Sequence, residues 1–212
     1  GYPVDVALVI DRSGSMDDLG ANPPQPLTDV KNTALYFIDR LGENDRHSLV
    51  SFANEASSPI DASFGVDLET IKMSIKNVSI VSGVVQNTNI GAGILAAREE
   101  LNSTRHRNSA DKALVLLTDG VATLPEKVGT VDYPKTYALE SARLAKEDGI
   151  IIYTIGLGKD VDTNLLKGLA STTAEAYFSP STKELNGIYN QIATKICRKS
   201  AAVIDIYVRL FP

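Results

Sequence analysis

Three oxygen-bearing side chains follow one apolar run at alternate positions near the start of the chain. Residues 7–16 have the sequence ALVIDRSGSM, in which a strand-like run stops at Asp11 and is followed by Ser13 and Ser15. Because the three alternate around a glycine, a tight loop can point them in one direction. Their oxygens are hard ligands, which suit Mg²⁺, Mn²⁺ or Ca²⁺ better than Zn²⁺ or copper. The alternative is an ordinary turn with a helix-capping serine.

Strand-like and helix-like segments alternate along the whole chain. Apolar runs predict strands at residues 4–10, 48–53, 113–117, 150–155 and 176–178. Apolar residues at helical spacing predict helices at residues 28–42, 67–78, 89–101, 134–147, 164–170 and 182–196. This order predicts one α/β domain: a doubly wound, Rossmann-like, mostly parallel sheet with helices on both faces.

Four residues carry local predictions about these helices. We expect Thr28 to be the N-cap of the first helix and Gly42 to suit its end. Gly91 and Gly93 are expected to let the first turn of their helix approach another backbone closely.

A second carboxylate follows another predicted strand. Asp119 lies in the sequence LLTDG, directly after the apolar run at residues 113–117. Sites in doubly wound sheets form in the crevice outside the C-terminal ends of the strands. We therefore expect Asp11 and Asp119 on one rim, where they would converge at the topological switch point if their strands are neighbours.

Composition excludes several classes of function. The chain has 212 residues and a net charge of −5, with no Lys/Arg run that could follow the phosphates of a nucleic acid. No apolar stretch approaches the roughly 20 residues that a spanning helix needs. Cys197 is the only cysteine, so the chain has no internal disulfide framework and no thiolate metal cluster. We expect Cys197 to be a small buried residue on a helix, with pairing outside the chain as the alternative.

The order of the motifs resembles the von Willebrand factor type A domain, whose metal site is the metal-ion-dependent adhesion site. The resemblance rests on D-x-S-x-S at residues 11–15, a threonine in NTNIGAGI ahead of the third amphipathic helix, and T-D-G at residues 118–120. It covers residues 4–197. The resemblance implies a metal site made of Asp11, Ser13, Ser15, Thr88 and Asp119. In this family the serines and the threonine tend to ligate directly, while the aspartates often act through water.

Two segments depart from the family pattern. Gln86 and Asn87 precede the threonine, where family members usually carry a glycine. The stretch at residues 17–26, DDLGANPPQP, is longer than the usual link to the first helix and is expected beside the metal rim, where it can shape the choice of partner.

The resemblance implies a binding module and not an enzyme. Its cofactor would be Mg²⁺, with Mn²⁺ or Ca²⁺ as alternatives, and an open coordination position would take an Asp or Glu carboxylate from a protein partner. The rim expected to meet that partner includes Asp17, Asp18, Asn89 and Thr123. Asp17 and Asp18 are expected to be solvated, with a second cation as the alternative. We expect a segment of a larger multidomain protein, extracellular or at the cell surface, with a cytoplasmic location left open.

Competing functions fit the residues less well. A phosphatase of the haloacid dehalogenase type needs a second aspartate where this chain has Ser13, and a dinucleotide site needs G-x-G-x-x-G after the first strand. For a Ser-His-Asp hydrolase, His47 is expected at the opposite rim, and His106, in the loop TRHRNSADK, is expected to be solvated. The alternative within the same fold is an intracellular subunit coupled to an ATPase in metal chelation or complex assembly.

The expected division of the chain is a domain at residues 1–198 and a strand-like tail at residues 199–212. In residues 201–212, AAVIDIYVRLFP, apolar and polar side chains alternate, which is typical of a half-buried strand. A lone strand is not stable in water. We therefore expect the tail to pair with an edge of this sheet, with another copy, or with a neighbouring β-rich domain.

Overall fold

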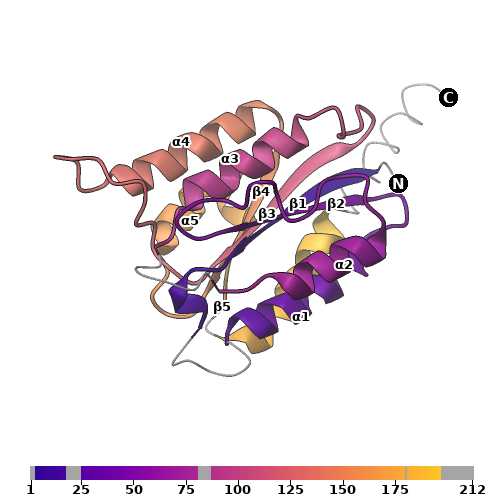
Figure 1. The fold of residues 1–212 in the computed structure, drawn as a ribbon, viewed down its shortest axis with the longest axis horizontal. Coiled ribbons are helices and arrows are strands. Elements are labelled where there is room, and N and C mark those ends of the chain that lie inside the picture. The colour runs from indigo at the N-terminus through magenta and orange to yellow at the C-terminus, as the bar shows by residue number, and fades with distance from the viewer. Residues whose placement is uncertain (1–2, 18–24, 81–86, 180, 197–212) are drawn as a thin grey trace.

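A single parallel sheet forms the centre of the molecule (Figure 1). The computed structural model describes residues 3–17, 25–80, 87–179 and 181–196. The strands in these residues are β1 (Val4–Asp11), β2 (Arg46–Phe52), β3 (Asp111–Thr118), β4 (Ile151–Leu157) and β5 (Ala176–Ser179). They pair in the order β2-β1-β3-β4-β5, and every pairing is parallel. The strand order therefore reverses between β1 and β3, as the predicted doubly wound fold requires.

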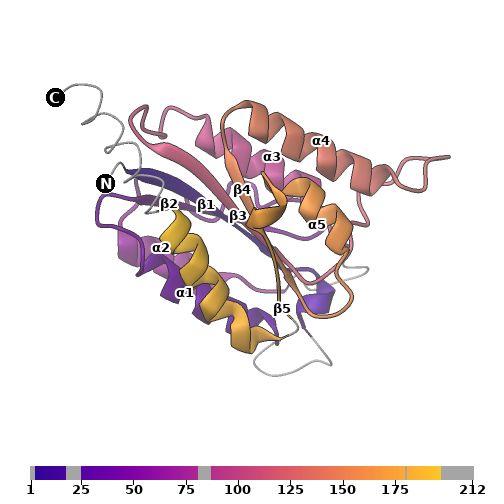
Figure 2. The ribbon, with the colours of Figure 1, turned by 180° about the vertical axis from the view of Figure 1, so that it is seen from behind.

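Helices cover both faces of this sheet, as Figures 1 and 2 show from opposite sides. One face carries α1 (Leu27–Ile38), α2 (Leu68–Asn77) and a helix over residues 185–196. The other face carries α3 (Ile90–Leu101), α4 (Tyr133–Glu147) and α5 (Thr163–Leu169). Each layer of helices buries its own apolar cluster against the sheet. The α/β fold with helices on both faces is confirmed.

Strand β1 is buried along its whole length, because it lies in the centre of the sheet between two helix layers. Val6, Leu8 and Ile10 face the layer of α1 and α2. Ala7 and Val9 face the layer of α3 and α4. The near-continuous apolar run of the sequence is what a strand covered on both faces needs. It brings the residues that follow it to a rigid position at the C-terminal rim.

The outer edge of β2 is covered by the chain that follows it. Leu49 and Ala62 exchange two backbone hydrogen bonds of 2.8 and 3.2 Å. Further along, the backbone N–H of Ser51 donates to a carboxylate oxygen of Asp61 at 2.6 Å. An open strand edge invites pairing with other chains, and this loop satisfies part of that edge within the molecule.

The first helix begins and ends earlier than its sequence predicts. Pro26 occupies the N-cap position, and the helix starts at Leu27, so the expectation that Thr28 is the cap is wrong. Proline suits the start of a helix because its missing N–H would have no partner there. The helix ends at Ile38, with Asp39 as its C-cap, so Gly42 lies beyond its end.

The close approaches at Gly91 and Gly93 are to side chains and not to another backbone. A methyl group at Gly91 would lie 2.4 Å from the ring of Tyr137 on α4. At Gly93 it would lie 2.9 Å from Phe52 and 3.0 Å from Val9. The two glycines therefore let α3 pack against α4 on one side and against the sheet on the other.

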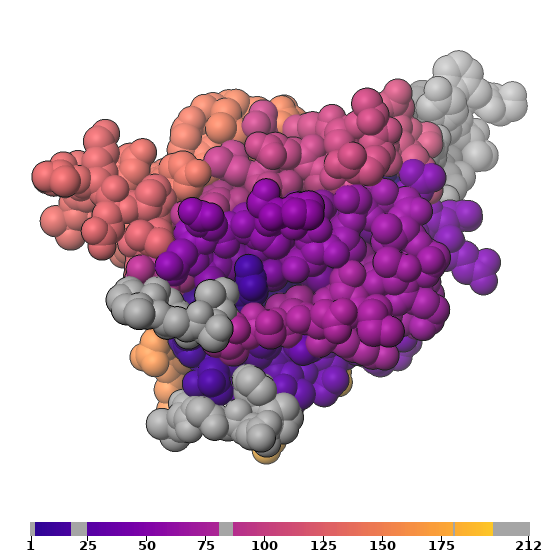
Figure 3. Space-filling view, viewed as in Figure 1, coloured from indigo at the N-terminus to yellow at the C-terminus, as the bar shows by residue number. Residues whose placement is uncertain are grey.

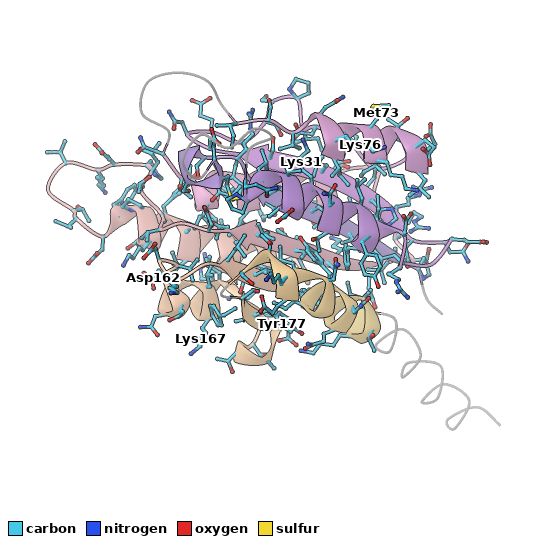
Figure 4. All side chains as sticks on the ribbon, turned by 90° about the horizontal axis from the view of Figure 1, so that it is seen from below. Lys31, Met73, Lys76, Asp162, Lys167 and Tyr177 are labelled. Atoms are coloured by element: carbon cyan, nitrogen blue, oxygen red, sulfur yellow. The ribbon has the colours of Figure 1, made fainter. Side chains whose placement is uncertain are left out.

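Two peripheral features complete the described part. The segment between β3 and α4 stands out from the body at the left of Figure 3, and its Val128 and Val131 are fully exposed. On the opposite helix layer, Tyr177 of β5 lies beside the helix over residues 185–196 (Figure 4), and Nζ of Lys195 lies 5.1 Å from the centre of its ring.

Some predictions concern residues that the structure does not describe. Asp18, Cys197 and the tail at residues 199–212 lie outside the described residues. The predicted final helix is present as a 3-10 turn at Thr182–Glu184 followed by the helix over residues 185–196. Among the helices in the described ranges, none has the length and apolar character to cross a bilayer.

Candidate metal centre

The end of β1 turns the first two predicted donors toward the rim of the sheet. A carboxylate oxygen of Asp11 accepts the backbone N–H of Ser13 at 2.8 Å, which closes a tight turn. A short 3-10 turn at Gly14–Met16 follows, and the fully buried side chain of Met16 anchors it. Ser13 is buried while Ser15 is exposed, and their hydroxyl oxygens lie 3.2 Å apart. The loop therefore presents two neighbouring hydroxyls above a buried carboxylate.

The second carboxylate meets this loop from the neighbouring strand. Residues Ile10 of β1 and Leu117 of β3 are paired in register, so both strands end at the same level. Asp119 follows β3, and its Oδ1 accepts a hydrogen bond of 2.7 Å from the hydroxyl of Ser15. The predicted convergence of Asp11 and Asp119 at the switch point between β1 and β3 is confirmed.

Thr118, the last residue of β3, joins the two motifs below the surface. Its hydroxyl donates to Oδ2 of Asp11 at 2.5 Å. The hydroxyl oxygen of Thr118 in turn accepts the backbone N–H of Gly120 at 3.2 Å. Thr118 and Asp11 are both fully buried. Sequence reasoning quoted Thr118 only as part of T-D-G and assigned it no role. The signal that could have identified it is a hydroxyl residue at the end of an otherwise apolar strand, directly before a predicted ligand.

Thr88 is held at the same rim by a second set of contacts. Its backbone N–H donates to the hydroxyl of Thr123 at 2.9 Å, and its carbonyl accepts the backbone N–H of Thr123 at 3.0 Å. On the other side, the side-chain carbonyl of Asn54 accepts the backbone N–H of Asn87 at 2.7 Å. Asn54 follows β2 and carried no prediction. Thr123, predicted at the partner rim, is exposed there. It also fixes the path of the loop that carries Thr88, called the threonine loop below.

Asn89, which was expected to face a partner, has a structural role. It is only 9% exposed, and its side-chain oxygen caps α3 by accepting the backbone N–H of Ala92 at 3.1 Å. Its side-chain amide donates to the carbonyl of Asn54 at 3.1 Å. The residue thus holds the start of α3 against the end of β2, because an unsatisfied helix terminus would be costly in this buried position.

Gly120 leaves open the space between the hydroxyls. A methyl group placed on Gly120 would lie 3.4 Å from Oγ1 of Thr88 and 3.7 Å from Oγ of Ser15. Two hydroxyls from different loops therefore border one small space, and Asp119 stands beside it through its bond to Ser15. Hydroxyl and carboxylate oxygens are the donors that hard divalent cations prefer. The residues present fit such a cation by their chemistry and by the space they leave.

Comparison with protein-family models gives a match to the von Willebrand factor type A domain over residues 5–191. The chain belongs to the von Willebrand factor type A domain family. This agrees with the resemblance that the three motifs carry and with the strand order of the sheet.

Curated relatives are similar to this type A domain at moderate identity. A UPF0353 protein of Nocardia farcinica is 28% identical in an alignment that covers 90% of this chain and 62% of the relative. Inter-alpha-trypsin inhibitor heavy chain H1 of Mesocricetus auratus is 26% identical over 91% of this chain and 21% of its own length. The chain thus spans about three fifths of the first relative and about a fifth of the second.

Solved structures show the same fold at lower identity. The von Willebrand factor domain of the type V pili tip protein Mfa5 of Porphyromonas gingivalis has a TM-score of 0.76 and 18% identity, covering 93% of this chain and 96% of that one. Proximal thread matrix protein 1 of the mussel byssus, with a zinc-occupied MIDAS motif, has a TM-score of 0.73 and 24% identity, covering 93% and 46%. At these identities the likeness establishes the fold.

Burial makes the carboxyl group of Asp11 a weaker acid than an ordinary aspartate. The pKa of Asp11 is raised from 3.8 to about 6, chiefly because burial removes water from its ionised form and also because Asp119 repels a second negative charge. Hydrogen bonds from Ser13 and Thr118 oppose this shift only in part. A positive charge in the open space would offset both causes. The electrostatics of the site therefore favour a bound cation over an empty pair of carboxylates.

Neither histidine lies near the hydroxyls of the site. His47 is at the start of β2, at the N-terminal rim of the parallel sheet, as predicted. The expectation that His106 is solvated is wrong: its side chain is 9% exposed, and its Nδ1 lies 2.9 Å from the buried carboxylate of Asp5. Arg107 binds the same carboxylate and provides the second half of this cluster. His106 therefore ties the loop before β3 to the start of β1.

Asp17, predicted as a solvated rim residue, is partly buried. Its Oδ1 has no hydrogen-bond partner in the described part of the chain and is shielded from solvent. A buried acceptor without a partner costs free energy. The expectation of a fully solvated side chain is therefore wrong for this residue.

The candidate donors of this site are mostly neutral hydroxyls and not a cluster of carboxylates, thiolates or imidazoles. Across residues 3–17, 25–80, 87–179 and 181–196, no three His, Cys, Asp or Glu side chains gather in a way that could hold a metal ion. Here the candidate donors are hydroxyls, with two aspartates supplying the charge. Hydroxyls are neutral, so they would leave a bound divalent cation able to attract a further anion.

Proposed function

We propose that this type A domain is a metal-dependent protein-binding module. The observation that carries the proposal is the convergence of three hydroxyl residues and two aspartates from separate loops at the switch point of the sheet. Ligands of doubly wound sheets bind at this place. The chain would hold a divalent cation there and present it to a partner at the exposed rim.

Each predicted residue has a distinct part in this proposal. The hydroxyls of Ser13, Ser15 and Thr88 would contact the cation, for which Mg²⁺ is our first choice and Mn²⁺ or Ca²⁺ are alternatives. Asp11 and Asp119 would supply negative charge, directly or through water. The bound cation would offer an open position to an Asp or Glu carboxylate of a protein partner.

The names of similar proteins support both parts of the proposal. One solved neighbour carries zinc in a MIDAS motif, which supports a divalent cation at the corresponding rim. Others are a pilus tip protein and the pilus adhesin SpaC of Lactobacillus rhamnosus GG, which supports binding as the function and an extracellular or cell-surface location. We infer binding and not catalysis, because the described histidines lie away from the serines and leave them without a base.

A peptide-binding experiment tests the module as a whole. A short peptide with a single aspartate should bind the Mg²⁺-loaded protein, and EDTA should abolish that binding. Thr88→Ala should weaken it strongly, because this hydroxyl borders the proposed metal position.

The matched control for this experiment is Thr194→Ala. It removes an exposed hydroxyl whose hydrogen bond within the described residues goes to the carbonyl of Asn190 in the same helix, and it should leave peptide binding unchanged. Binding that survives both EDTA and Thr88→Ala would show that the metal rim is not the interface.

A further inference from the structure

The segment between β3 and α4 has an exposed apolar tip. We call residues 121–132 the finger, which stands out from the body in Figure 3 and in which Val128 and Val131 are fully exposed. The backbone N–H of Thr130 donates to the carbonyl of Lys127 at 3.0 Å, so the tip is a closed turn. Apolar surface held out in water gains free energy when a second surface covers it. The finger is therefore suited to docking.

A cavity beside the root of the finger has an apolar lining that is open to solvent. Its volume is about 640 Å³, within the range of about 300–1,000 Å³ that is usual for binding clefts. It lies between α3, the loop after β2 and Tyr137 of α4, and we call it the α3 groove. Its half-buried apolar residues include Ile60, Ala92, Leu95 and Ala96. The groove therefore offers apolar surface of the kind that the tip of the finger also exposes.

The finger and the α3 groove carry charges that complement each other. Beside the valines, the finger exposes Glu126 and Lys127. The groove is lined by the exposed Glu99 and by Arg105, whose side chain is 50% exposed while it binds Glu100. Each charge on the finger thus has a group of opposite sign in the groove, which favours one register of docking over others.

A lipid surface fits the finger less well than this protein surface does. Insertion into anionic membranes is usually supported by clusters of Lys and Arg beside the apolar residues. The finger has Glu126 and Asp132 against the single Lys127, and the whole chain has a net charge of −5. The α3 groove, by contrast, matches both the apolar and the charged groups of the finger.

The root of the finger lies at one end of the α3 groove. The rings of Tyr133, where α4 begins, and of Tyr137, which lines the groove, have centres 6.3 Å apart. The finger points away from the body (Figure 3) and so leaves the groove of its own copy open. A two-fold axis near this root would place the finger of each copy over the groove of the other. Such a reciprocal contact closes at two copies.

We propose that two copies of this chain form a dimer in which the finger of each packs into the α3 groove of the other. The two valines would cover the apolar lining, and the charges beside them would pair across the contact. The valines and the groove residues lie outside the candidate metal centre, so the contact does not depend on a metal. Two metal rims in one dimer would add avidity to the proposed function.

Sedimentation equilibrium over a series of protein concentrations in EDTA tests the dimer, since chelation excludes contacts that a metal ion bridges. The average mass of the wild-type protein should rise from that of one chain toward that of two. The finger variant, Val128→Ser with Val131→Ser, should abolish this rise. The groove variant, Ala96→Lys, places a long side chain in the groove and should do the same. Met73→Ser is the control, because it removes an exposed apolar side chain on α2 and should leave the dimer unchanged.

A mixture of the finger variant and the groove variant distinguishes a reciprocal contact from other dimers. The groove variant keeps its finger and the finger variant keeps its groove, so one of the two contacts can form between them. The mixture should therefore contain heterodimers, although each variant alone is a monomer. A dimer held by finger against finger would not be restored in this way.

Several results would overturn the proposal. They are a wild-type protein that stays monomeric at every concentration, a dimer that survives replacement of both valines, and a mixture without heterodimers where the wild-type protein is fully dimeric. Binding of a monomeric wild-type protein to vesicles of phosphatidylcholine and phosphatidylglycerol, lost in the finger variant, would assign the finger to lipid and also overturn the proposal.

Discussion

Asp11 makes no contact with solvent, yet it determines the charge of the exposed rim above it. Its two oxygens are held by the backbone of Ser13 and the hydroxyl of Thr118. These contacts fix the orientation of a carboxylate whose ionised form burial disfavours. Groups that orient the residues around a metal commonly change metal affinity without touching the metal themselves. Two predictions follow from this arrangement of residues.

The first concerns Thr118→Val, which preserves the shape of a buried β-branched residue and removes its hydroxyl. Mg²⁺ affinity should fall about 10- to 100-fold, as for the loss of other groups that orient metal ligands. Isothermal titration calorimetry gives the affinity. Thr154→Val on β4 is the control, since Thr154 is equally buried but bonds the carbonyl of Leu166. A loss of affinity as large in the control would show that general destabilisation, and not the contact with Asp11, is responsible.

The second prediction concerns pH. Because the pKa of Asp11 is raised to about 6, a proton competes with the cation below that pH, and Mg²⁺ affinity should fall by up to about tenfold per pH unit in this range. The stability of the metal-free protein should change with pH in the opposite direction from its Mg²⁺ affinity. The folded state holds the proton of Asp11 more tightly than the unfolded chain does, so this contribution to stability is lost as the pH rises through about 6. Calorimetric titrations on either side of pH 6, with circular dichroism to confirm folding, check the first statement. An affinity that does not change across pH 6 would contradict it.

At the scale of the elements, the packing of α3 decides where the threonine loop ends and the helix begins. Asn89 caps this helix, and Gly91, two residues further on in its first turn, admits the ring of Tyr137. Alanine is normally the better helix former by about 1 kcal/mol. The contact with Tyr137 is short enough that overpacking should reverse the usual benefit.

Two glycine-to-alanine changes of opposite expected sign test this packing. Gly91→Ala should destabilise the domain by about 1–3 kcal/mol, because its methyl group would overlap the ring of Tyr137. Gly187→Ala, in the helix over residues 185–196, meets nothing within 4 Å and should stabilise by about 0.5–1 kcal/mol. Urea unfolding of both variants gives the two signs. Stabilisation by both would show that α3 can move away from α4 at little cost.

The sequence predicted elements better than it predicted the contacts between them. The apolar run before Asp11 was sufficient to predict a central strand, because burial on both faces requires apolar residues at every position. By contrast, the bond from His106 to Asp5 joins residues about a hundred positions apart. Nothing local to a charged loop distinguishes a histidine with such a partner from a solvated one. The start of α1 was missed for a similar reason, since Thr28 has the chemistry of a cap but Pro26 holds the position.

At the scale of the whole molecule, the doubly wound topology brings the predicted donors together. The strand order of the sheet places β1 between β2 and β3, so the loop after β1 lies beside both the loop that carries Thr88 and the loop that carries Asp119. Three motifs spread over more than a hundred positions of the sequence therefore meet at one rim. The pocket beside that rim could not be predicted, because its lining combines residues at the start of α1 with residues of the β4–α5 loop.

A calorimetric titration of Mg²⁺ into the wild-type protein and into Asp11→Asn tests the central claim most directly. The variant keeps the size of the buried side chain and removes its charge, and circular dichroism would confirm that the fold is retained. We predict one equivalent of Mg²⁺ bound by the wild-type protein and no measurable binding by the variant, because two neutral serines and a threonine with one remaining carboxylate hold a hard cation weakly. Equal Mg²⁺ affinity in the two proteins, or no binding by the wild-type protein, would contradict the assignment of this rim as a metal centre.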